Sequence, residues 1–154
     1  MIVVTIQAII AISYLLFLYN RFGEVPSSIS DSYYRLPIRL KGLFTLFCWS
    51  LGSAMMLHGG YLFFISGLGL CLAGMSTRYN KYTINALLHY VGAMLAIVGG
   101  FLSLIYYFDL IQYPIIFAYV SAVHYLYDRK NIIWWVEVHA IVLLITGITH
   151  SYLL

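Results

Sequence analysis

Long apolar stretches alternate with short polar ones along the chain, and this alternation predicts its secondary structure. Six apolar segments can be marked, at about 2–19, 43–58, 60–77, 83–107, 112–127 and 132–153. Most approach the roughly 20 residues that an α-helix needs to cross a bilayer core. Lipid offers the backbone no hydrogen-bond partner, so the spanning segments must be helical. We therefore predict an all-α polytopic membrane protein whose residues 1–154 form one bundle of six transmembrane helices.

The second and third apolar segments lie very close together in the sequence. Only Gly59 and Gly60 separate them. A link this short predicts a tight helical hairpin. A single bent helix would instead destroy the alternation of charged loops on which the topology rests.

Basic residues occur only in alternate gaps between the apolar segments. The first, third and fifth gaps hold all eight of them: Arg21, Arg35, Arg39, Lys41, Arg78, Lys81, Arg129 and Lys130. Loops rich in Lys and Arg resist translocation, so these gaps should be cytoplasmic. Both termini should then lie outside. We expect a multi-pass protein of the cell membrane, which in a bacterium would be the inner membrane.

The composition agrees with a bilayer environment and excludes a nucleic-acid partner. The chain is 63% apolar and 8% charged, whereas soluble domains have roughly 25% charged residues. All the positive side chains behind the net charge of +3 lie in the predicted cytoplasmic loops. These loops do not form the concentrated basic face that nucleic-acid binding needs.

Small residues recur at helical spacing in the third and fourth segments. The two stripes are Gly67, Cys71 and Gly74, and Gly92, Ala96 and Gly100. Such stripes allow close approach of helix backbones within a membrane. They predict packing seams, and they are also compatible with a homo-oligomer.

Histidines are the main candidates for chemistry, because ionisable residues inside a membrane usually face a cavity, a partner or an ion. His89, His124 and His139 are predicted at one depth, toward the cytoplasm. Three such ligands with an open position would suit a zinc site. Hydrogen bonding to a backbone carbonyl across a helix seam is the structural alternative.

The spacing of ionisable residues in the last apolar segment bears on whether they can form a single metal site. Glu137 lies two residues before His139, so at most one of them can face a given pocket. His139 and His150 are eleven residues apart, which places them on one helix face separated by about 16 Å. Each could bind one of two stacked b-type haems. His89 or His124 would supply the inner partner, and His58 the outer one.

The polar stretch after the first segment contains a cluster of serines followed by Asp31. Ser30 or Asp31 could cap a short helix or form a turn. Alternatively, Asp31 could fold over the cytoplasmic mouth of the bundle as a ligand or base beside His89 and His139.

The SISD sequence at 28–31, the compact helical hairpin and the LHYVGA sequence at 88–93 carry a resemblance. They resemble bacterial and phage-encoded membrane proteins that are distantly similar to the superfamily of alkaline ceramidases and adiponectin-type receptors. The resemblance implies a zinc-dependent hydrolase that cleaves a lipid amide or ester, with His89 and His139 as ligands. Glu137 or Asp31 would take the proton from a zinc-bound water. The superfamily's HxxxH pair on the last helix and its seventh helix are missing from this sequence.

Three functions therefore stay open at the level of sequence. The first is a metal-dependent hydrolase of membrane lipids, with His89, His124 and His139 as ligands and Glu137 and Asp31 as catalytic carboxylates. The second is a small transporter, or a membrane assembly or regulatory protein, with no cofactor. The third is an electron-transfer protein that carries two b-type haems.

Overall fold

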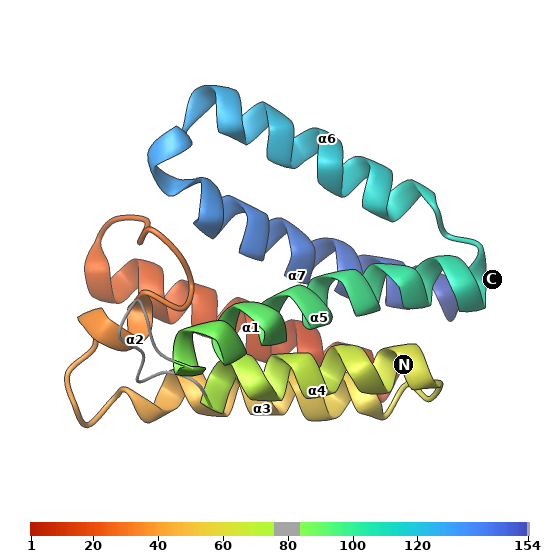
Figure 1. Ribbon diagram of the computed structural model, residues 1–154, viewed down its shortest axis with the longest axis horizontal. Coiled ribbons are helices and arrows are strands. Elements are labelled where there is room, and N and C mark those ends of the chain that lie inside the picture. Colours follow the sequence, from red (N-terminus) through yellow and green to blue (C-terminus); the bar gives the residue numbers. More distant parts are fainter. Residues whose placement is uncertain (76–83, 154) are drawn as a thin grey trace.

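The computed structural model describes residues 1–75 and 84–153, and this part of the chain is all-helical, without a strand. The elements are α1 (Ile2–Phe22), α2 (Ser32–Arg35), α3 (Gly42–Met56), α4 (Tyr61–Met75), α5 (Ile84–Phe108), α6 (Gln112–Tyr127), the 3-10 helix η1 (Arg129–Asn131) and α7 (Ile132–Ser151). The long helices run roughly along the longest axis of the molecule, which is horizontal in Figure 1. The helix boundaries lie within three residues of those expected from the apolar segments.

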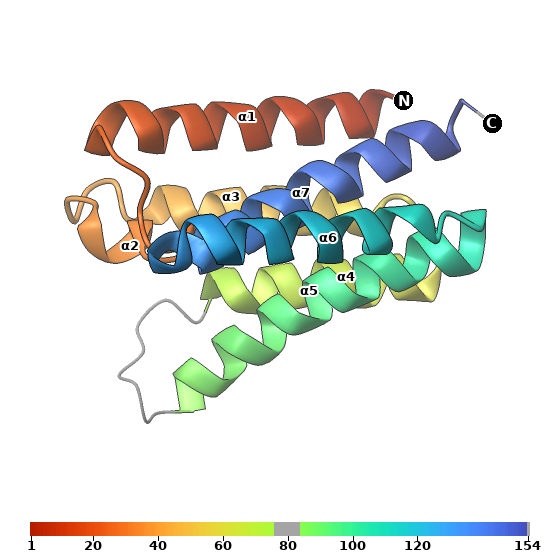
Figure 2. The same cartoon turned by 90° about the horizontal axis from the view of Figure 1, so that it is seen from above.

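The two termini lie at one end of the molecule, and α2 lies at the opposite end (Figure 2). The α6–α7 connection is at the α2 end as well. The described basic residues lie at the end of α1, in α2, between α2 and α3, or in the α6–α7 connection: Arg21, Arg35, Arg39, Lys41, Arg129 and Lys130. Arg78 and Lys81 lie outside the described residues. We call this end of the bundle the basic end.

Helix length divides the candidate membrane spans into two groups. Three segments are long and apolar enough to cross a membrane: Ile2–Phe22, Ala86–Phe108 and Arg129–Ser151. The apolar helices Gly42–Met56 and Tyr61–Met75 have 15 residues each, which corresponds to only about 22 Å of helix. By length and composition the structure thus has three candidate spans among its described residues.

The α3–α4 hairpin turns through two consecutive glycines with left-handed backbone angles. Gly59 has φ of 78° and Gly60 has φ of 80°. Residues with a Cβ rarely adopt this conformation, which explains why glycine occupies both positions. The chain therefore reverses within a few residues, and α3 and α4 lie side by side.

The small-residue stripes mark close contacts between helices. A Cβ added at Gly52 of α3 would lie 2.6 Å from the carbonyl oxygen of Gly67 on α4. On the next seam, a Cβ added at Gly92 of α5 would lie 2.7 Å from the carbonyl oxygen of Gly69 on α4. Backbone atoms touch at both places, so these glycines set how closely α3, α4 and α5 can pack. Gly52 and Gly69 were not part of the predicted stripes.

Helix α6 is the least embedded of the long helices. Its only buried residue is Tyr113, and Figure 1 shows it standing away from α1, α3 and α4. Its main neighbour is α7, with which it forms an antiparallel hairpin. The other long helices surround the cavity described next.

Candidate ligand cavity and the histidine positions

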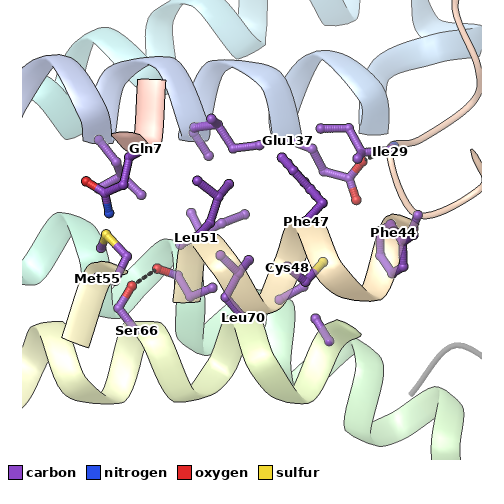
Figure 3. Close-up of a pocket in the computed structure, with 18 of the residues that line it drawn as sticks. Gln7, Ile29, Phe44, Phe47, Cys48, Leu51, Met55, Ser66, Leu70 and Glu137 are labelled. Carbon is purple, nitrogen blue, oxygen red and sulfur yellow. Dashed lines mark hydrogen bonds between the residues drawn. The ribbon is translucent and has the colours of Figure 1, made fainter. Parts of the chain in front are cut away.

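A cavity of about 100 Å³ lies between α1, α3, α4, α5 and α7 (Figure 3). Its walls are mainly aliphatic and aromatic side chains, such as Phe47 and Leu51 of α3 and Leu70 of α4. The polar or ionisable residues that line it are Gln7, Ser30, Cys48, Ser66, His89 and Glu137. Figure 3 shows Gln7 and Ser66 toward one end and Glu137 with Ile29 toward the other. An apolar middle thus separates two polar ends.

The Glu137 end of the cavity is covered by the loop that connects α1 and α2. The backbone N–H of Ile29 donates a hydrogen bond to the Glu137 carboxylate. The backbone N–H of Trp134 donates to the carbonyl oxygen of Ser27 at 3.1 Å. Ile29 is 3% exposed, although it belongs to a loop. The loop of residues 24–31, called here the α1–α2 loop, is therefore held against the first turns of α7.

Hydrogen bonds at the C-terminal end of the loop fix its position relative to α1. The Ser32 hydroxyl donates to the carbonyl oxygen of Ile29 at 2.5 Å, and its oxygen lies 2.8 Å from the Tyr14 hydroxyl. Asp31 donates its backbone N–H to the Ser28 hydroxyl at 2.9 Å. Asp31 precedes α2, whereas Ile29 and Ser30 line the cavity. Asp31 itself is not a lining residue.

The opposite end of the cavity is closed by Gln7, which is 1% exposed. Its side-chain oxygen lies 2.9 Å from His58 Nε2, and His58 Nδ1 lies 3.1 Å from the Tyr152 hydroxyl. Partial burial lowers the pKa of His58, with a smaller contribution from the N-terminal ammonium group. A neutral imidazole therefore links α1, the α3–α4 turn and the end of α7. Sequence reasoning missed Gln7, although an amide in an otherwise apolar helix is a usable signal.

The predicted metal ligands occupy two separate places. His89 lines the cavity, is 5% exposed, and donates its Nδ1–H to the carbonyl oxygen of Ala73 at 2.9 Å. His124 and His139 lie together instead, with ring centroids 4.7 Å apart. Within the described ranges, no group of three or more His, Cys, Asp or Glu side chains could hold a metal ion. The structure thus brings two of the three predicted ligands together and leaves His89 elsewhere.

Glu137 and His139 lie on different sides of α7. Glu137 lines the cavity, while His139 contacts His124 of α6. This separation follows from their two-residue spacing in a helix. Glu137 therefore belongs with Ile29 and Ser30, and His139 belongs with the α6–α7 hairpin.

The outer histidines of the dihaem hypothesis have protein partners. His150 Nδ1 lies 3.2 Å from the Tyr113 hydroxyl. His58 bonds Gln7 and Tyr152, as described above. These two histidines thus have hydrogen-bond partners on other segments of the chain.

Asp128 anchors the α6–α7 connection. Its carboxylate accepts hydrogen bonds from Trp135 Nε1 at 2.9 Å and from the Asn131 side chain at 3.1 Å. These bonds, that from Trp135 first, hold the pKa of Asp128 below its usual range. The carboxylate is therefore ionised near neutral pH and keeps the Trp135 indole in place beside His124.

No protein-family model, no curated protein and no solved structure matches this chain.

Proposed function

We propose that this protein is a multi-pass protein of the cell membrane that binds the hydrocarbon chain of a lipid inside its helix bundle. The observation that carries the proposal is the cavity with an apolar middle and polar groups at its two ends. A lipid has the same division, since its long apolar chain ends in a polar head group. The Glu137 end, where the α1–α2 loop lies, would take the head group.

The size and chemistry of the cavity support a hydrocarbon occupant over water. A buried water needs about 10–15 Å³ and several polar partners. The cavity volume of about 100 Å³ exceeds that need, but its middle offers no row of polar partners. Apolar cavities of comparable size stay dry and accept small hydrocarbons. One segment of an acyl chain therefore suits the space better than a column of water.

Six spans with both termini outside are the topology that accompanies this proposal. The basic end would face the cytoplasm, because it holds all the described Lys and Arg side chains. The shorter helices α3 and α4 would be accommodated by local thinning of the bilayer or by packing against longer neighbours. Their backbones touch at Gly52 and Gly67, so they would cross as one closely packed pair.

Cysteine labelling tests this topology. In a background with Cys48 and Cys71 replaced by alanine, Leu153→Cys and Ile38→Cys each place one thiol at an exposed position. A membrane-impermeant maleimide should label Leu153→Cys in intact cells and Ile38→Cys only after permeabilisation. Labelling of Ile38→Cys in intact cells would contradict the proposed orientation.

Filling the cavity should remove the bound lipid. Ala93 lines the cavity, and Ala93→Phe would place a ring where the acyl chain is proposed to lie. Because overfilling a packed interior costs about 1–3 kcal/mol, we expect lipid retention to fall roughly tenfold. The measurement is mass spectrometry of lipid extracted from protein purified in mild detergent.

Ala118→Phe is the matched control, since Ala118 is exposed on α6. It should retain the wild-type amount of lipid per protein. Equal lipid content in wild type, Ala93→Phe and Ala118→Phe would mean that the extracted lipid is bound on the outer surface of the bundle.

Hydrolysis of the bound lipid is the second candidate function, and the position of Glu137 favours it. A carboxylate at the polar end of the cavity lies where the ester or amide of a bound lipid would be placed. Such a group can act as a general base toward water. Ser30 and His89 line the same cavity and would supply further polar contacts.

A further inference from the structure

A pair of histidines lies on the α6–α7 hairpin, outside the cavity. His124 lies near the end of α6 and His139 lies two turns into α7. Their ring centroids are 4.7 Å apart and their planes are inclined by 55°. Neither histidine lines the cavity, so the pair is separate from the proposed lipid site.

The hydrogen bonds of His124 fix the role of each ring nitrogen. Its Nδ1 lies 3.1 Å from the carbonyl oxygen of Val120. A carbonyl only accepts, so Nδ1 carries the proton in this bond. The neutral ring then has its lone pair on Nε2. Donation of the other ring N–H to a backbone carbonyl is the usual arrangement of a metal-binding histidine.

His139 supplies an independent observation. Its Nδ1 is buried and has no hydrogen-bond partner among the described residues. Most buried polar side-chain atoms have a partner, and an exception calls for an explanation such as an ion. A metal bound to this nitrogen would supply the missing partner.

The distance between the rings suits one shared ion. With metal–nitrogen bonds of about 2.1 Å, two imidazoles on one tetrahedral ion have ring centres roughly 5 Å apart. The observed centroid distance of 4.7 Å is close to that value.

Trp135 forms a wall beside the pair. Its ring stacks on His124 at 4.4 Å and on His139 at 6.0 Å. The hydrogen bond from its indole to Asp128 holds it there. Trp135 is therefore a positioning residue for both imidazoles, and it is also a fluorescent reporter next to them.

We propose that His124 and His139 form a two-nitrogen binding site for a divalent transition ion such as Cu²⁺ or Zn²⁺. Imidazole is a preferred ligand of both ions. Water would complete the coordination shell, because the described residues offer no third His, Cys, Asp or Glu ligand. The ion would link α6, which has few buried contacts, to α7.

The test is a titration of tag-free protein in mild detergent with Cu²⁺, following tryptophan fluorescence. Bound Cu²⁺ should quench Trp135 in a saturable way, with one ion per chain by elemental analysis and competition by Zn²⁺. His124→Ala and His139→Ala should each weaken binding at least about tenfold, the scale seen on loss of even an outer-shell partner. His124→Gln, which is closer in size to histidine, should weaken binding to the same degree.

Two controls separate this site from other copper sites. His150→Ala removes a histidine that is paired with Tyr113, and it should leave copper affinity unchanged. Trp135→Phe should reduce the quenching while elemental analysis still finds one ion. No saturable binding, wild-type affinity in His124→Gln, or equal loss in His150→Ala would overturn the proposal. Lipid content of the same samples reports separately on the cavity.

Discussion

Replacing Gly67 by leucine is expected to abolish the packing of α3 against α4 and to leave little folded protein. A Cβ at this position would collide with the carbonyl oxygen of Gly52, and it would lie 3.2 Å from the backbone nitrogen of Met56. Backbone atoms cannot move aside as the end of a flexible side chain can. Overpacking in ordinary cores costs about 1–3 kcal/mol, and a backbone collision should reach or exceed the upper value.

The measurement for Gly67→Leu is the folded fraction by size-exclusion chromatography in detergent, together with the melting temperature. Gly42→Leu is the matched control, because a Cβ at Gly42 meets no atom within 4 Å. The control should elute and melt like wild type. If Gly67→Leu also did so, α3 and α4 would not cross as closely as the structure shows.

Replacing Glu137 by alanine is expected to release the α1–α2 loop from α7. The substitution leaves the backbone N–H of Ile29 without its acceptor. A buried donor that loses its partner costs about 1–3 kcal/mol, which corresponds to a roughly 5- to 150-fold larger open population. Amide hydrogen exchange of residues 27–31 should accelerate by that factor.

Glu137→Gln separates the structural role of this side chain from a catalytic one. The glutamine side chain retains an oxygen that can accept the Ile29 N–H, so loop exchange should stay near the wild-type rate. It cannot act as a base, so any lipid hydrolysis by the purified protein should be lost. Wild-type exchange in Glu137→Ala would show that the carboxylate does not hold the loop, and full hydrolysis in Glu137→Gln would exclude it as the base.

The helices could be predicted because their determinants are local. Each apolar segment is bounded by polar residues or by glycines, and the Gly59–Gly60 link predicted the tight turn that the structure has. The number of membrane spans was harder to predict from the sequence. Three segments reach the length of a complete span, whereas α3 and α4 have 15 residues each and α6 has 16.

The site was harder to predict because it depends on which helix faces are neighbours. Their predicted depth in the membrane grouped His89 with His124 and His139. Depth does not specify how each helix is rotated about its own axis, and so it does not specify which side chains face one another. The structure turns His89 toward Ala73 of α4 and His139 toward α6. The contact between Ile29 and Glu137 joins residues 108 positions apart, and no sequence spacing could have indicated it.

The most direct test of a lipid chain inside the bundle is photo-cross-linking in reconstituted bilayers, with a phospholipid that carries a diazirine near the end of its acyl chain. We expect adducts on cavity residues such as Leu51 and Leu70, and their loss in Ala93→Phe but not in Ala118→Phe. Adducts confined to outward-facing residues such as Ile9 and Tyr119, in the same amount in all three proteins, would contradict it.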